Sequence, residues 1–92
     1  MKHIVFFKLN ERTKENQDKL VMILNKMQGK IDFVHSLSAK ADFLNSERSF
    51  DVVLEVTLDK ENLDAYANDP LHVACKQEFA SFIEKTVVVD VE

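Results

Sequence analysis

The sequence predicts an α+β domain in which helices cover one face of a four-stranded antiparallel sheet. Two observations carry this prediction. Two segments alternate with the two-residue period of strands and two more are rich in β-branched and aromatic residues, while the apolar residues between them recur at helical spacing. The resulting order is β-α-β-β-α-α-β, the split βαβ arrangement of a ferredoxin-like fold, with the first and third strands in the middle of the sheet. The length of 92 residues suits one domain, residues 1–92.

The first half of the chain contains two predicted strands and one helix. Residues 3–9 are β-branched and aromatic, as expected of a strand, and their odd-numbered positions share one face. Thr13 is a suitable N-cap for the helix that follows, and Gly29 is placed to end it. Its apolar residues lie at helical spacing: Leu20, Val21, Ile23, Leu24 and Met27. Residues 34–43 alternate as a half-buried strand does.

The second half contains two further strands around two helices. Residues 50–58 form the clearest strand, with an apolar face of Phe50, Val52, Leu54, Val56 and Leu58. The opposite face carries Asp51 and Glu55, which we interpret, like Asp42, as ordinary polar residues. Asp59 can cap a short helix, Asp69 can cap a second one, and residues 86–91 form the last strand.

The sheet face that the helices leave uncovered is also predicted to be apolar. It carries Ile4, Phe6, Val53 and Val88. One chain has no further layer to cover these residues, and such a patch is typical of an interface. We therefore expect a homodimer.

Composition excludes several classes of function. The net charge is −4 and the lysines are scattered, which argues against nucleic acid as a partner. No apolar run is long enough to cross a membrane, and the first apolar stretch stops at Lys8 without a signal-peptide cleavage site. The single Cys75 indicates a reducing, cytoplasmic setting and behaves as a small apolar residue. No spacing matches a metal site.

Candidate chemistry is concentrated between Tyr66 and His72. Asp69 followed by Pro70 is a helix start, which places His72 at the third helical position. The positive end of the helix dipole and an apolar pocket there oppose protonation, so His72 can act as a base. Tyr66 can donate a hydrogen bond to an enolate oxygen. The structural alternatives are a histidine that fixes the turn and a tyrosine of the core.

Motifs along the whole chain resemble one known family. They are Lys2-His3-Ile4-Val5-x-Phe7-Lys8, Phe50-Asp51, Glu55-Val56, Tyr66-Ala67-x-x-Pro70-x-His72 and Val87-Val88-Val89-Asp90-Val91. In this order they resemble the stress-responsive A/B barrel (Dabb) family. The resemblance implies a dimeric α/β barrel in which the sheets of two subunits pack together.

One plant branch of that family is similar to polyketide cyclases, which close a poly-β-keto chain without a cofactor. The resemblance implies catalytic roles for His72 and Tyr66, with His3 in the same pocket. The sequence departs from the cyclase pattern at Val52 and Asp69, where the cyclases carry histidines. We expect His3, Val5, Val52 and Leu54 to line the pocket, and His35 to be solvated.

Two hypotheses of function follow. The first is a dimeric protein with an apolar small-molecule pocket near Tyr66 and His72. Its enzymatic variant is cofactor-independent and acts on a ketone-like or aromatic compound, in the manner of a cyclase or a monooxygenase. The second is a non-catalytic stress or assembly protein. An open cavity beside His72 favours the first hypothesis, and a closed interior favours the second.

Overall fold

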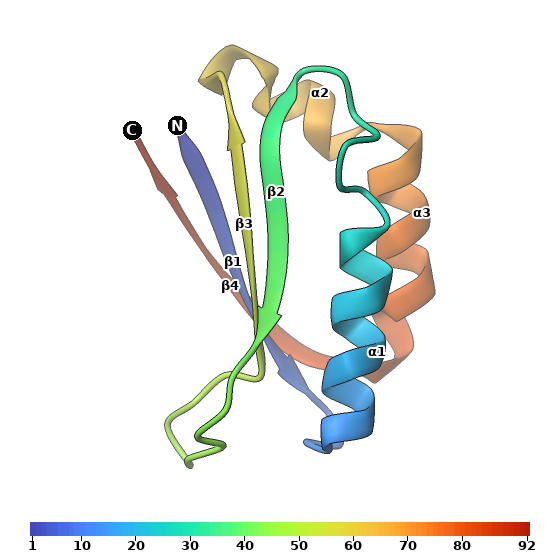
Figure 1. The fold of residues 1–92 in the computed structure, drawn as a ribbon, viewed down its shortest axis with the longest axis vertical. Helices are drawn as coiled ribbons and strands as arrows, with labels where there is room; N and C mark the ends of the chain where they lie inside the picture. The colour runs from blue at the N-terminus through green and yellow to red at the C-terminus, as the bar shows by residue number, and fades with distance from the viewer.

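Four strands form one antiparallel sheet, and the helices lie along one of its faces (Figure 1). The structure is a computed structural model that describes all residues, 1–92. Its elements are β1 (Lys2–Leu9), α1 (Lys14–Asn25), β2 (Val34–Ala41), β3 (Val52–Leu58), η1 (Lys60–Asn62), α2 (Leu63–Ala67), α3 (Pro70–Phe79), η2 (Ala80–Phe82) and β4 (Ile83–Val91). The strand order β2-β3-β1-β4 confirms the predicted ferredoxin-like topology, with the first and third strands in the middle.

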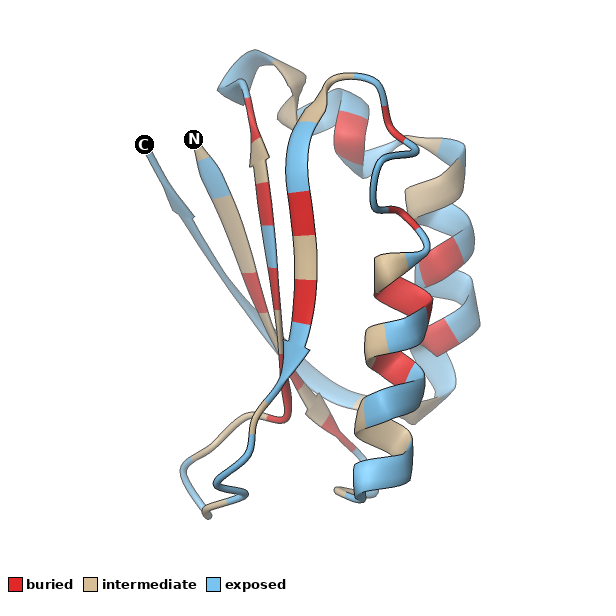
Figure 2. Cartoon of the chain, in the orientation of Figure 1, coloured by how far each residue is buried: buried red, intermediate tan, exposed pale blue.

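The hydrophobic core lies between the sheet and the helices. Buried positions alternate with more exposed ones along β2 and β3, as the strand period requires (Figure 2). On β1 the buried side chains are Val5, Phe7 and Leu9, which confirms the predicted inner face. A membrane span would need a longer and more apolar helix than any that this structure contains.

Helix α1 begins as predicted but ends earlier. The Thr13 hydroxyl accepts a hydrogen bond from the Asn16 backbone N–H at 3.1 Å, the bond expected of an N-cap. The regular helix ends at Asn25, and the chain continues in tighter turns to Lys30. Backbone bonds between residues three apart replace the helical ones there, and Gly29 has a φ of +71° within these turns.

Strand β2 is shorter than the alternating pattern indicated. It ends at Ala41, and the side chain of Phe43 is 96% exposed. The Asp42 carboxylate accepts a hydrogen bond from the Asn45 N–H at 2.7 Å, and Asn45 has a φ of +53°. This local turn directs the chain away from the sheet before Phe43 can join the inner face.

The interpretation of Asp51 as a polar-face residue was wrong. Strand β3 starts at Val52, and the Asp51 carboxylate before it is only 1% exposed. It accepts hydrogen bonds from the Leu9 N–H at 2.9 Å and from Arg12 Nε at 3.0 Å. Arg12 also donates to two carbonyl groups of the β2–β3 loop, so the cluster joins the end of β1 to that loop.

The predicted outer face needs one correction. The register of β4 places Val88 opposite Val5 of β1, and therefore on the helix side of the sheet. Val87 and Val89 lie opposite Phe6 and Ile4, so they belong to the outer face. Three consecutive valines are apolar on both faces, so pairing with β1 and not the pattern determines which face each one joins.

Asp59 precedes η1, but its side chain makes no capping hydrogen bond. Its carboxylate lies 3.4 Å from Nε2 of His35 instead.

Candidate functional site

The site is organised around the turn between α2 and α3. One carboxylate oxygen of Asp69 accepts hydrogen bonds from the N–H groups of Leu71 at 2.9 Å and His72 at 3.4 Å. Pro70 occupies the first position of α3. These contacts confirm the predicted cap and place His72 in the first turn of the helix, facing the sheet.

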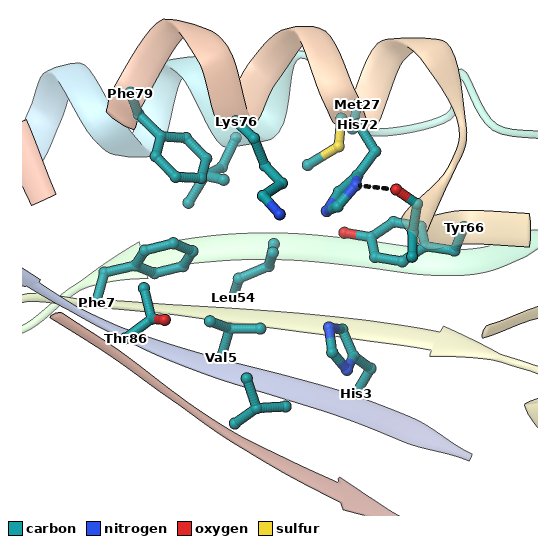
Figure 3. Close-up of a pocket in the computed structure, with 13 residues that line it drawn as sticks. His3, Val5, Phe7, Met27, Leu54, Tyr66, His72, Lys76, Phe79 and Thr86 are labelled. Atoms are coloured by element: carbon teal, nitrogen blue, oxygen red, sulfur yellow. Dashed lines mark hydrogen bonds between the residues drawn. The ribbon is translucent and has the colours of Figure 1, made fainter. Parts of the chain in front are cut away.

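A cavity of about 280 Å³ opens between the sheet and the helices at this point (Figure 3). Strands β1, β3 and β4 form its floor, and the three helices contribute its walls. Nine of its 13 lining residues are hydrophobic, so it suits the apolar part of a ligand. The lining residues are His3, Val5, Phe7, Leu24, Met27, Leu54, Tyr66, Ala67, His72, Lys76, Phe79, Thr86 and Val88.

His72 is held with one ring nitrogen available to the cavity. Its Nδ1 lies 3.1 Å from the carbonyl oxygen of Ala67. A carbonyl oxygen only accepts, so Nδ1 carries a hydrogen and the neutral ring has its lone pair on Nε2. Burial lowers the pKa of His72 below its usual 6.5, with smaller contributions from Lys76 and His3. The Ala67 carbonyl and the Asp69 charge oppose this shift without reversing it. The imidazole is therefore a neutral base at pH 7.

Tyr66 presents a buried hydroxyl with no hydrogen-bond partner in the chain. The residue is 1% exposed, and its ring centroid lies 4.4 Å from that of His72. Burial raises the pKa of the phenol above its ordinary value, and the nearby Cys75 and Asp69 add to this effect. The hydroxyl therefore remains a donor. A buried hydroxyl without a partner is exceptional in folded proteins, and Figure 3 shows that this one points into the cavity.

His3 joins the site from β1, on the helix side of the sheet as predicted. Its ring meets the Tyr66 ring edge-on, with centroids 5.7 Å apart. Its Nδ1 lies 2.6 Å from a carboxylate oxygen of Asp90 on β4. The structure thus brings His3, Tyr66 and His72 together at one end of the cavity, while the His35 side chain is 57% exposed elsewhere.

The expected lining residues divide into two groups. Val5 and Leu54 line the cavity, but Val52 does not. Val52 comes two residues before Leu54 on the same face of β3, so the two side chains are about 6.6 Å apart along the strand. It is buried nearer the β2–β3 loop, opposite Phe7.

Sequence reasoning missed Lys76, which also lines the cavity. The signal that could have found it is its spacing, because residues four apart on a helix share a face and Lys76 follows His72 by four.

Other reactive groups lie outside the site. Cys75 is buried, its thiol donates to the Ile23 carbonyl at 3.5 Å, and burial raises the pKa of the thiol. It is therefore a protonated core residue and not a nucleophile. No group of three or more His, Cys, Asp or Glu side chains is arranged to hold a metal ion.

Several solved structures share this fold. A dimeric protein of unknown function from Bacteroides fragilis is 24% identical with a TM-score of 0.82, over 99% of this chain and 93% of that chain. A Dabb family protein from Mesorhizobium loti is 17% identical with a TM-score of 0.80, over 99% and 93%. The hydroxynitrile lyase from Passiflora edulis is 18% identical with a TM-score of 0.75, over 96% and 87%. At these identities the likeness concerns the fold.

No curated protein sequence gives a significant match to this chain. A family model described as the stress responsive A/B barrel domain, Dabb, matches residues 1–92. Because that match spans the whole sequence, this chain belongs to the stress responsive A/B barrel domain family.

Proposed function

We propose that this protein binds a small ketone-like or aromatic compound in the cavity beside His72 and Tyr66, and that it can move a proton on that compound without a cofactor. The observation that carries the proposal is the pairing of a neutral base with an unpartnered buried donor. His72 offers the lone pair of Nε2, and the Tyr66 hydroxyl is available beside it. Apolar walls around both groups would exclude water from a bound ligand.

The proposed step is abstraction of a proton from a carbon next to a carbonyl group. The C–H bond breaks, its hydrogen joins Nε2 of His72, and the electron pair forms an enolate. The Tyr66 hydroxyl donates a hydrogen bond to the enolate oxygen, where negative charge develops. The Ala67 carbonyl accepts from Nδ1 and so helps to hold the imidazolium that forms. Return of the proton from Nε2 completes the cycle.

A homodimer is part of the proposal. The outer sheet face carries six apolar side chains: Ile4, Phe6, Val53, Val87, Val89 and Val91. Val87 and Val89 are 39% and 48% exposed in the single chain. Solved structures of the same fold are described as dimeric, and burying this face against a second copy would remove the patch from water. The lone Cys75 suits the reducing cytoplasm, where we place the dimer.

A purely structural role would be expected to go with a filled interior around His72. The cavity therefore supports ligand binding over such a role. One structural neighbour is named as a hydroxynitrile lyase, so a chain of this fold can carry an enzyme site. The residues that would act here are nevertheless argued from this chain alone.

Deuterium exchange into phenylacetone tests the proposal directly. In D₂O, ¹H NMR should show faster loss of the benzylic proton signal with protein than with buffer. His72→Asn should slow the protein-dependent exchange by at least about 100-fold, the usual contribution of a general base. His35→Asn is the matched control, because His35 is exposed and outside the cavity. This variant should catalyse the exchange at the wild-type rate.

Tyr66→Phe separates catalysis from packing. It should slow exchange by about 100-fold, as loss of an oxyanion donor does. Because the hydroxyl has no partner in the chain, the same change should leave the free energy of unfolding unchanged or slightly raised. Binding of phenylacetone without exchange would reduce the function to ligand binding. If phenylacetone does not change the NMR chemical shift of the His72 ring, the proposal is refuted.

A further inference from the structure

Lys76 is a polar residue of the cavity that the proposed proton transfer does not use. Lys76 lies one helical turn after His72 on α3, and its ammonium group points into the cavity between His72 and Phe79 (Figure 3). Lys76 forms no ion pair with any carboxylate of the chain, although Lys14 of α1 and Lys26, which follows that helix, do. An ammonium group at an apolar cavity is a recognition element for an anion.

Three carboxylates on elements that border the cavity are already engaged. Asp69 accepts from the first turn of α3, and Asp90 is bound to His3. Glu78, two residues along the helix, contacts Lys26 at 3.1 Å. The charge of Lys76 is consequently not neutralised by a contact within the chain.

The remaining groups define where an anion would bind. The Tyr66 hydroxyl is a buried donor aimed into the same cavity, and its raised pKa keeps it protonated. Lys76 also contributes to lowering the pKa of His72, which reflects the proximity of the two groups. Two donors and one neutral base thus face a space whose other walls are mostly hydrophobic.

From this arrangement we infer that the ligand is a small aryl keto acid, whose carboxylate is bound by Lys76 while its carbonyl group faces Tyr66 and its acidic C–H faces His72. The inference rests on the proposed function and adds the anionic group to the substrate class. The volume of about 280 Å³ is at the lower limit of ligand pockets, about 300–1,000 Å³, and suits a compound with one aromatic ring. A cationic analogue is disfavoured by Lys76.

Binding of matched carboxylate and amide ligands tests this inference. The probes are 3-phenylpropanoate and 3-phenylpropanamide, which share a shape and differ in charge, with affinities measured from ¹H–¹⁵N NMR shifts of the full chain at low salt. Wild-type protein should bind the carboxylate at least about tenfold more tightly, the usual advantage of a charged hydrogen bond. Phenylpyruvate, the keto acid itself, should bind at the same site.

Lys76→Met should weaken carboxylate binding far more than amide binding and so remove the preference for the carboxylate, whereas Lys76→Arg should retain the preference. Lys30→Met is the matched control, because it removes the same charge from an exposed turn outside the cavity. Lys76→Met should also raise the His72 titration midpoint, and Lys30→Met should not. Far-UV circular dichroism establishes that each variant is folded.

The outcomes distinguish two failures. Equal affinity of wild-type protein for the carboxylate and the amide would overturn the role of Lys76 and leave the proposed function standing. Failure of all three probes and of phenylacetone to shift the His72 and Tyr66 signals would refute the proposed function, and this inference with it. A carboxylate preference that persists in Lys76→Met would assign the anion contact to another residue and overturn the inference alone.

Discussion

Replacing Asp51 by alanine should be among the most destabilising polar substitutions in this chain. Its carboxylate is 1% exposed and is bound by the Leu9 N–H and by Arg12 Nε. Arg12 in turn donates to the carbonyl groups of Ser46 and Ser49. Removing the carboxylate leaves an unpaired N–H at the end of β1 and a cation that no longer has a counter-charge.

The magnitude follows from the burial of the two partners. Removing one partner of a buried ion pair costs about 3–5 kcal/mol. The Arg12 side chain is 24% exposed, so water can hydrate part of the freed charge, and the lower end of that range applies. We expect Asp51→Ala to reduce the free energy of unfolding by about 3 kcal/mol, which for a domain of this size lowers Tm by more than about 10 °C. Asp51→Asn keeps an acceptor oxygen but loses the charge, and should cost about half as much.

Urea unfolding followed by circular dichroism measures these differences. All variants are compared at one protein concentration, because the stability of a dimer depends on concentration. The matched control is Asp18→Ala, whose pair with Lys14 is exposed, with side chains 60% and 84% accessible. That change should cost no more than about 0.5 kcal/mol. If the Asp51→Ala protein is as stable as the Asp18→Ala protein, Asp51 does not form a stabilising buried ion pair with Arg12. Additive effects of Arg12→Ala and Asp51→Ala in the double variant would refute that ion pair as well.

Three further predictions address the dimer, the turn and the base. Light scattering should give about twice the 10.6 kDa chain mass. Val53→Asp should shift the protein toward monomer, because a charge buried without a partner is costly. A wild-type monomer at micromolar concentration would refute the dimer. Asp69→Ala should lower the free energy of unfolding by about 1 kcal/mol in urea titrations, whereas Asp69→Ser and Asp69→Asn retain a capping oxygen and should cost little; equal losses from all three would exclude capping. His72 should titrate below 6.5 by NMR, because burial disfavours its charged form. His72 then binds a proton more readily in the unfolded chain than in the folded one. The free energy of unfolding should therefore fall as the pH decreases through 6.5 toward the lower folded-state pKa, and His72→Asn should lessen that fall. An upshifted His72 would contradict the neutral-base assignment.

The parts of the fold that could be predicted are those determined by neighbouring residues. Thr13 and Asp69 cap their helices through N–H groups two or three residues away, so a short stretch of sequence contains the whole interaction. The faces of β1 and β3 follow from alternation within each strand. Asp51 could not be assigned in this way, because Arg12 and Leu9 approach it from the other end of the chain. Val88 shows the same limit, since only its pairing with Val5 determines its face.

The candidate site was predictable in its face but not in its extent. Alternation on β1 places His3 toward the helices, and the Asp69-Pro70 turn brings His72 next to Tyr66. Which residues along an inner face reach the cavity depends on where the helices stop covering the sheet. That is why Leu54 lines it and Val52, on the same face, does not. The missing partner of the Tyr66 hydroxyl is likewise a property of the packed interior.

The two faces of strand β1 can vary independently, so the residues of the cavity can change while the outer face of the sheet stays the same. The strand is central and is hydrogen-bonded to both β3 and β4, so its backbone position is set from both sides. Its odd-numbered side chains, His3 and Val5, line the cavity, while Ile4 and Phe6 lie on the opposite face. Because successive side chains of a strand point to opposite faces, residues of the cavity can change without disturbing the outer face. Chains that share this architecture at less than 25% identity therefore need not share a reaction, and the function proposed for this one depends on His72, Tyr66 and the side chains around them.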